Sequence, residues 1–310
     1  MSNLLKTIPI PISGLMLGLV SLAKLHFSLN MNLLGEFYFA VGITIFLIIL
    51  CKIVFTFSDV RNDLKNQVIA SVAPTFTMGM MVICSILAAQ TSLQGIATIG
   101  WGIAACLQMV LILYFTYTFV WKAKANFHSV YPSWFIVYVG SAIMPITAGN
   151  FAAKFTDIVF WIALFFYILL LPVVWQRIRS LEGPTMPLTT ILAAPGSLCL
   201  TAYLQHFTSP NLYFVLFMLV VSQLLYASVL WRLPKLLKLP FYPSYAAFTF
   251  PLVISATAMN ASAQFFHSQQ LLNVLTFVEL FIASCMVLYV LVRYVLFLKV
   301  QASDMTNLQR

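Results

Sequence analysis

Ten long apolar runs constrain the fold of this chain more than any other feature. They lie at residues 9–28, 33–54, 68–88, 94–120, 131–149, 155–176, 186–205, 211–231, 243–265 and 271–298. A transmembrane helix requires roughly 20 consecutive apolar residues. Strands of a membrane barrel would show segments of alternating polarity, and these runs do not alternate. We therefore expect an all-α integral membrane protein with ten transmembrane helices in one domain, residues 1–310.

Composition excludes the soluble classes of protein. Only 7% of the residues are charged, whereas soluble domains carry about 25%. So few charges cannot cover a surface that faces water, which excludes a soluble enzyme. Disorder is excluded because 62% of the residues are hydrophobic. The net charge of +9 does not indicate nucleic-acid binding, since membrane proteins concentrate basic residues in their cytoplasmic loops.

The distribution of lysine and arginine predicts the orientation of the helices. With ten spans and the N-terminus inside, 14 of the 16 basic residues fall on the cytoplasmic side. They are Lys6, Lys52, Arg61, Lys65, Lys122, Lys124, Arg177, Arg179, Arg232, Lys235, Lys238, Arg293, Lys299 and Arg310. Only Lys24 and Lys154 fall outside. The positive-inside rule thus predicts a multi-pass protein of the inner (plasma) membrane with both termini cytoplasmic.

Prolines mark alternate runs and suggest an internal repeat. The odd-numbered runs carry Pro11, Pro74, Pro145, Pro195 and Pro251, with a mean spacing of 60 residues. A proline inside a helix frees a backbone carbonyl, which in a bilayer must face protein or water. We therefore expect five helical hairpins with quasi-fivefold symmetry, in which odd helices form an inner ring and even helices an outer wall. The alternative is that proline is simply more frequent in membrane helices.

An inner ring of five helices can enclose a pore. Each of the five prolines is followed within four residues by a hydroxyl side chain. We expect the pore lining and the helix bends to include Pro11, Ser13, Gly14, Pro74, Thr77, Pro145, Thr147, Pro195, Ser197, Pro251 and Ser255. Such groups contact a permeating ion weakly, which suits conduction. Small residues can equally serve close helix packing, so this alternative stays open.

Three segments resemble a known family of membrane proteins. They are Pro9-Ile10-Pro11-Ile12-Ser13-Gly14, Ala193-Ala194-Pro195-Gly196-Ser197, and Ala247-Phe248-Thr249-Phe250-Pro251-Leu252. They resemble the tellurite-resistance/dicarboxylate transporter family, which includes TehA-like proteins, the yeast malic acid permease and plant slow anion channels. The resemblance implies ten helices as five hairpins, an inner ring of odd helices and a homotrimer. It also implies a gating role for Phe250, which matches the phenylalanine that plugs the pore in that family.

No signature of catalysis is present in the sequence. HExxH, GxSxG and P-loop patterns are absent, and neither the histidines nor the five cysteines show metal-ligand spacing. We therefore expect no enzyme, no metal and no cofactor. Glu279 is the acidic residue deepest within a run. It is a structural hydrogen-bonding group, a proton-coupling group or part of a subunit interface.

Basic residues gather at the predicted outer ends of odd helices. Lys24, His26, His206 and His267 lie there, while Glu36 and Asp157 are the acidic residues expected on the same side. Such an outer mouth would attract anions, the more so when histidines are protonated. The alternative is that loop histidines near lipid headgroups have no specific role.

Together these features predict a membrane anion channel or transporter. Small inorganic or organic anions would pass through a five-helix pore that Phe250 gates. The alternative is a proton-coupled carrier of malate-like C4-dicarboxylates, or an exporter of tellurite or sulfite. A ten-helix drug/metabolite exporter is a rival fold, but its repeat would be inverted, with a period near 150 residues.

Overall fold

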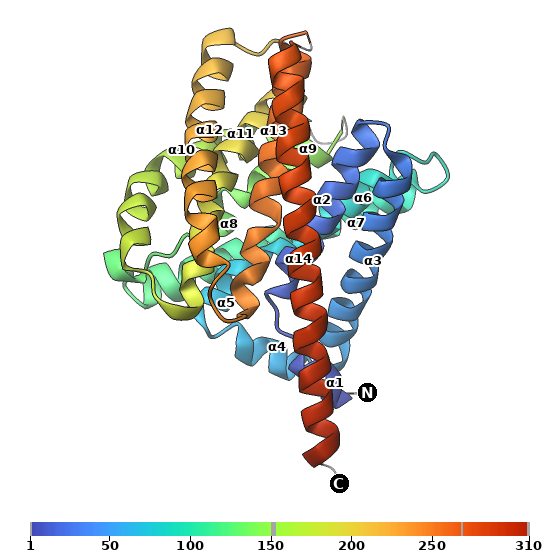
Figure 1. The fold of residues 1–310 in the computed structure, drawn as a ribbon, viewed down its shortest axis with the longest axis vertical. Helices are drawn as coiled ribbons and strands as arrows, with labels where there is room; N and C mark the ends of the chain where they lie inside the picture. The colour runs from blue at the N-terminus through green and yellow to red at the C-terminus, as the bar shows by residue number, and fades with distance from the viewer. Residues whose placement is uncertain (1, 150–152, 268, 309–310) are drawn as a thin grey trace.

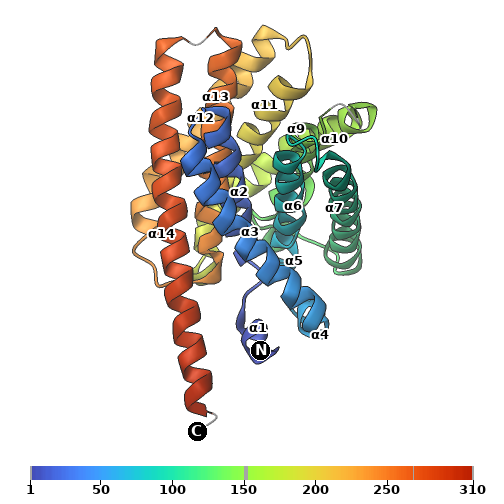
Figure 2. The ribbon, with the colours of Figure 1, turned by 90° about the vertical axis from the view of Figure 1, so that its right-hand side faces the viewer.

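The computed structural model of the chain describes residues 2–149, 153–267 and 269–308, and it describes the side chains of residues 5–149, 154–267 and 269–303. Over these residues the protein is all-helical. Long helices run roughly parallel to one another, and both ends of the chain lie at the same end of the molecule (Figures 1 and 2). No β-strand occurs within those ranges.

The helices divide into inner and outer segments. The inner segments are α2 (Ile12–Ser28), α5 (Gln67–Val72), α6 (Pro74–Leu87), α8 (Trp134–Tyr138), η3 (Gly140–Ala142), α9 (Ile143–Thr147), η5 (Gly183–Ala193), α11 (Ala194–His206), η6 (Pro243–Phe248) and α13 (Phe250–Phe265). The outer segments are α3 (Asn32–Phe55), α7 (Gln94–Phe115), η1 (Thr116–Lys122), α10 (Ala153–Arg177), η4 (Ile178–Ser180), α12 (Leu212–Leu236) and α14 (Gln270–Leu308). The short helices α1 (Ser2–Thr7), α4 (Phe57–Asp63) and η2 (Phe127–Ser129) complete the chain.

The inner segments pack as a closed ring. α2 contacts α6, α6 contacts α9, α9 contacts α11, α11 contacts α13, and α13 returns to α2. The outer helices attach as hairpin partners, since α3 packs on α2, α7 on α6, α10 on α9, α12 on α11 and α14 on α13. The first and last inner helices are therefore neighbours, although they lie at opposite ends of the sequence.

Burial separates the two groups of helices. Within Gly183–His206, 94% of the residues in the most apolar 18-residue stretch are buried. The corresponding share is 28% in Asn32–Phe55 and in Gln94–Lys122. The outer helices expose large side chains such as Leu33, Ile96 and Trp231. The outer helices are apolar on nearly every side, as expected of helices that contact lipid.

Eight helical stretches are long and apolar enough to cross a membrane within the described ranges. They are Asn32–Phe55, Gln67–Leu87, Gln94–Lys122, Lys154–Ser180, Gly183–His206, Leu212–Leu236, Pro243–Phe265 and Gln270–Ser303. The apolar helix Ile12–Ser28 is shorter, at 17 residues. The run 131–149, expected as one span, is divided into α8, η3 and α9. Pro145 removes a backbone donor there, and Gly140 packs so closely on Met78 that an added Cβ would lie 2.9 Å from its sulfur.

Four of the five prolines of the odd-numbered runs lie at or beside the start of an α-helix, and Pro145 lies within α9. Pro74, Pro195 and Pro251 each occupy the first or second position of α6, α11 or α13, and Pro11 is the N-cap residue of α2. Proline is tolerated in a first turn because its missing N–H would have no partner in the helix. In the stretches 67–87, 183–206 and 243–265 a new α-helix thus starts directly after a shorter helical segment.

Candidate functional site

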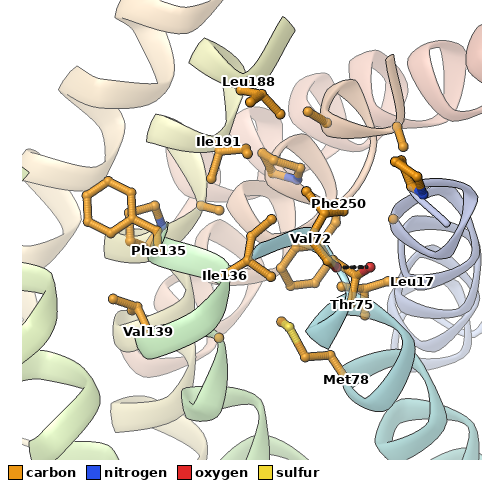
Figure 3. Close-up of a pocket in the computed structure, with 18 of the residues that line it drawn as sticks. Leu17, Val72, Thr75, Met78, Phe135, Ile136, Val139, Leu188, Ile191 and Phe250 are labelled. Atoms are coloured by element: carbon orange, nitrogen blue, oxygen red, sulfur yellow. Dashed lines mark hydrogen bonds between the residues drawn. The ribbon is translucent and has the colours of Figure 1, made fainter. Parts of the chain in front are cut away.

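A central cavity of about 60 Å³ lies among the inner segments, which fall in five stretches of the chain, residues 12–28, 67–87, 134–147, 183–206 and 243–265. Each of these stretches contributes residues to its wall (Figure 3). The lining includes Pro11, Gly14 and Leu17 of α2; Val72, Thr75 and Met78 of α5 and α6; Phe135 and Ile136 of α8; Leu188, Ile191 and Pro195 of η5 and α11; and Ala246, Phe250 and Pro251 of η6 and α13. The wall is almost wholly apolar, with hydroxyl groups only from Thr75 and Ser244 among the described lining residues.

Helix starts surround this cavity. Pro11, Pro195 and Pro251 line it at or beside the first turns of α2, α11 and α13, while Thr75 follows Pro74 at the start of α6. The first turn of a helix carries a partial positive charge, because its backbone N–H groups lack partners within the helix. In this structure the first-turn N–H groups of Ser13, Gly14 and Leu252 already donate to the carbonyl oxygens of Ile10, Pro11 and Thr249, and α11 follows η5 without a break. The helix starts therefore favour negative charge through the dipoles of α2 and α13, at a site that holds no charged side chain among the described lining residues.

Phe250 separates the central cavity from a second one. Its side chain is 7% exposed, and its ring extends into the centre of the site between Ile136 and Thr75 (Figure 3). The second cavity, here called the distal cavity, has a volume of about 100 Å³ and lies toward the C-terminal ends of α2 and α13. Phe250 lines both cavities, and no other described residue does.

The distal cavity is more polar than the central one. Its wall includes Ser21, Lys24, Ser28, Gln205, Thr257, Asn260 and Gln264. A third, larger cavity of about 560 Å³, here called the side cavity, shares Lys24 and Ile146 with it. The described linings of these two cavities contain no aspartate or glutamate.

The hydroxyl groups named from the sequence bind neighbouring helices. Ser13 Oγ lies 2.7 Å from Thr75 Oγ1, and Ser197 Oγ lies 3.0 Å from Ser255 Oγ. Thr77 donates to the Gln108 side chain of α7, and Thr147 accepts a 2.8 Å hydrogen bond from Trp101 Nε1. None of Ser13, Thr77, Thr147, Ser197 and Ser255 lines the central cavity, and Thr147 lines the side cavity. Their pore-lining role stays a prediction.

The prolines and Gly14 divide in the same way. Pro11, Gly14, Pro195 and Pro251 line the central cavity, whereas Pro74 and Pro145 are not part of its wall. Gly14 is needed for close approach, because a Cβ added there would lie 3.1 Å from the Cβ of Ala246.

The four residues expected at an outer mouth lie in different surroundings. Lys24 lines the distal and side cavities. His26 is buried, with Nδ1 2.9 Å from the carbonyl oxygen of Leu22 and its ring 5.2 Å from that of Tyr38. His206 Nε2 lies 2.6 Å from Asp157 Oδ1, and His267 is exposed. The structure does not bring the four side chains together.

The sequence did not single out the large apolar residues of the central wall. Leu17, Met78, Ile136, Leu188 and Ile191 line the cavity, but the inner helices are apolar on every side, so periodicity does not show which face points to the centre. Among the described residues, no group of three or more His, Cys, Asp or Glu could hold a metal ion.

A ring of buried helices around two cavities that share Phe250, enclosed by apolar outer helices, is typical of a multi-pass membrane channel or transporter. Comparison with protein families matches residues 7–295 to the SLAC1 family, described as voltage-dependent anion channel. The chain therefore belongs to this family of anion channels and transporters, as the resemblance had indicated. A comparison with curated proteins finds no match.

Proposed function

We propose that this protein conducts small anions through its ring of inner segments and that Phe250 is the gate. The observation that carries the proposal is that Phe250 alone among the described residues lines both the central and the distal cavity. A phenyl ring at this position blocks an ion by its bulk, and its apolar surface disfavours a hydrated ion. A rotamer change would join the two cavities.

Anion preference follows from the charges around the path. The positive ends of the α2 and α13 dipoles lie at the central cavity, where Pro11 and Pro251 line its wall. Lys24 adds a full positive charge to the distal wall, and the described walls of both cavities lack acidic groups. An anion therefore meets favourable electrostatic potential along the path, whereas a cation does not.

The proposed arrangement in the membrane has ten spans as five hairpins with quasi-fivefold symmetry. The closed packing of the inner segments supports this arrangement. The placement of both chain ends at one end of the molecule supports an even number of crossings (Figure 1). The excess of lysine and arginine in the loops at that end supports cytoplasmic termini in the inner (plasma) membrane.

Anion flux through liposomes that contain Phe250→Ala tests the gate. We expect the variant to raise chloride flux about tenfold or more, since each ~1.4 kcal/mol removed from a barrier gives a factor of ten. Phe248→Ala is the matched control. Phe248 is fully buried, packs on Tyr245 at 4.8 Å and lines neither cavity. Its truncation should cost about 3–5 kcal/mol of stability and leave flux low.

The same pair of variants can reject the gate. If Phe250 were only a packed core residue, Phe250→Ala would lower the melting temperature as Phe248→Ala does and leave chloride flux unchanged. A panel of chloride, nitrate, malate, tellurite and sulfite in the same liposomes identifies the anion.

A buried carboxyl group favours a second candidate function, a proton-coupled carrier of malate-like C4-dicarboxylates or an exporter of tellurite or sulfite. Glu279 of α14 is 3% exposed, and its Oε2 has no hydrogen-bond partner in the structure. Carboxyl groups inside membranes often carry protons in coupled transporters. A coupled carrier would accumulate malate when a pH gradient is imposed, and Glu279→Gln would abolish that accumulation. Currents that reverse at the chloride equilibrium potential and do not depend on the pH gradient would instead identify a channel.

The proposed partners are the lipid bilayer and two further copies of the chain. The apolar outer helices supply the faces for both contacts, and the homotrimer follows from the family resemblance. The mass of the detergent-solubilised protein, corrected for bound detergent, tests the trimer.

A further inference from the structure

A lysine stands beside the proposed gate. Lys24 is on α2, and its side chain lines the distal cavity together with Phe250. Its Nζ donates to Ser85 Oγ at 3.1 Å and to the carbonyl oxygen of Ile146 at 3.2 Å. These two bonds fix the ammonium group between α2, α6 and the end of α9.

Among the residues whose side chains the structure describes, no acidic group forms an ion pair with this lysine. Both recorded acceptors of Lys24 are neutral oxygens, and the described ion pairs involve Lys6, Lys52 and His206 instead. An ammonium group inside a protein is normally paired with a counter-charge, because desolvation of an isolated charge is costly. At Lys24 the counter-charge is left to come from one of the two cavities that it lines, of which only the distal cavity also contains Ser21 and Phe250.

An unpartnered hydroxyl lies on the same wall. Ser21 precedes Lys24 by three residues, so the two side chains share one face of α2. Ser21 Oγ is buried without a hydrogen-bond partner in the structure, and Ser21 also lines the distal cavity. A buried hydroxyl without a partner calls for a ligand or water, since buried polar groups are otherwise nearly always hydrogen-bonded.

The cavity has room for a small ion. A volume of about 100 Å³ exceeds the roughly 10–15 Å³ that a single water requires on the same measure. The amide side chains of Asn260, Gln264 and Gln205 complete the polar part of the wall. Amide N–H groups and a hydroxyl can donate to an anion whose charge the ammonium group balances.

We propose that Lys24 and Ser21 form a binding site for one monovalent anion in the distal cavity, on the far side of Phe250 from the central cavity. The site names the substrate class within the proposed channel function, on which it rests. One positive charge balances one negative charge. A C4-dicarboxylate would leave its second carboxylate without a cation, because Lys24 is the single charged side chain of the described distal wall.

The position of the site explains how one lysine can speed conduction. An anion bound beside Phe250 waits at the barrier, so its local concentration there exceeds that in bulk. Two neutral hydrogen-bond acceptors hold the ammonium group in place, so that it does not follow the ion. Binding is therefore strong enough for an anion to arrive and weak enough for it to leave.

Chloride flux and chloride-dependent melting of the full-length protein test the site. Lys24→Met removes the charge and the donor, Lys24→Gln keeps a donor without the charge, and Lys24→Arg keeps both. Lys154→Met is the matched control, since Lys154 is exposed on α10 and lines none of the three cavities. Each protein is measured in liposomes with and without Phe250→Ala.

We expect Lys24→Met and Lys24→Gln to raise the half-saturating chloride concentration about tenfold and to lower the chloride-to-potassium permeability ratio, as loss of one nearby charge predicts. Lys24→Arg and Lys154→Met should behave as the parent protein. In detergent, chloride in place of gluconate should raise the melting temperature of the parent protein and of Lys24→Arg, but not of Lys24→Met or Lys24→Gln. Ser21→Ala should also raise the half-saturating chloride concentration and reduce the rise in melting temperature that chloride causes.

The two readouts separate the proposals. If all proteins conduct chloride alike and their melting responds alike to chloride, the anion site is rejected while the channel stands. If no protein conducts chloride but melting depends on Lys24, the channel is rejected while the anion site stands. If malate flux saturates at a lower concentration than chloride flux, and if this difference depends on Lys24, the assignment of the site to a monovalent anion is wrong.

Discussion

The hydroxyl group of Thr249 shares its proton between the carbonyl oxygens of Ala246, at 2.7 Å, and Gly14, at 3.0 Å. The second of these bonds joins the last inner segment to the first and so closes the ring. It also fixes the residue that directly precedes Phe250. The conformation of the proposed gate therefore depends on how closely α2 approaches the start of α13.

Gly18 controls that approach, and Gly18→Ala should disturb it. A Cβ at residue 18 would lie 2.6 Å from Thr249 Cβ and 3.2 Å from the backbone nitrogen of Phe250. Because a backbone atom and a Cβ cannot move aside as the end of a flexible side chain can, we expect a loss of about 1–3 kcal/mol in the free energy of unfolding. Chloride flux should change with it, because Thr249 and Phe250 shift. Gly102→Ala is the control, since an added Cβ there meets nothing within 4 Å. Equal stability of the two variants would contradict the close contact.

The hydroxyl pair of Ser197 and Ser255 should act as a unit. Ser197 Oγ donates to the carbonyl oxygen of Ala193 at 3.0 Å and lies 3.0 Å from Ser255 Oγ, and either hydroxyl of this pair can be the donor. In a double-mutant cycle with alanine at both positions, we expect a coupling of about 0.6 kcal/mol, the usual value for such pairs in membranes. Chloride selectivity should be unchanged, because neither residue lines a described cavity wall. A change in anion selectivity with no coupling would assign the two hydroxyls to the pore.

Lys52 should hold the N-terminal segment on α3. Its side chain is 2% exposed, and its Nζ donates to the carbonyl oxygens of Ile8 at 2.6 Å and Lys6 at 3.2 Å, with Asp63 at 3.7 Å. Lys52→Met leaves the buried carbonyl oxygen of Ile8 without this donor, at a cost of about 1–3 kcal/mol. Faster proteolysis before residue 12 and a lower melting temperature would show it.

Lys65→Met provides the control for Lys52. Lys65 is exposed and donates to Asn62 Oδ1 at 2.9 Å, so its loss should cost less than about 0.5 kcal/mol. If the two variants resist protease and heat to the same degree, the role of Lys52 in anchoring the N-terminal segment is wrong.

Single cysteines in a background without native cysteines should reveal the orientation in the membrane. Lys124 and Lys238 are exposed at the end of the molecule where basic residues gather. A membrane-impermeant maleimide should therefore label Lys124→Cys and Lys238→Cys only from the cytoplasmic side. Lys154→Cys should react from the outside. Labelling of either cytoplasmic position from outside would exclude the ten-span arrangement.

The alternation of prolines predicted an inner ring of odd-numbered runs with quasi-fivefold symmetry, and this arrangement stays a prediction, while the described contacts join α2, α6, α9, α11 and α13 in a closed series. The reason is physical, because segments with freed backbone groups must avoid lipid. The pattern did not predict that the prolines start new helices, nor that run 131–149 divides at Gly140. Both depend on contacts with other segments, such as that of Gly140 with Met78.

The candidate site was harder to predict from the sequence than the fold was. Phe250 was singled out by family resemblance, since the 27 phenylalanines of the chain are otherwise alike. The hydroxyls were recognised as a set, but their partners are set by helix rotation, which a helix that is apolar on every side does not encode. Lys24 was placed near the outer end of the first helix, yet its contact with the cavity beside Phe250 requires α6, α9 and α13 to be in position.

The absence of charge from the central wall has a consequence for the response to membrane voltage. Transfer of one elementary charge across a membrane is worth about 2.3 kcal/mol per 100 mV. Rotation of the Phe250 ring moves no formal charge, and the described wall of the central cavity contains no ionised side chain to move with it. In the proposed gating by Phe250, the electric field therefore acts through the anion in transit and through Lys24, whose side chain lines the distal cavity together with Phe250. Any dependence of opening on the membrane potential should therefore arise from these two charges, while the current through each opening follows the potential.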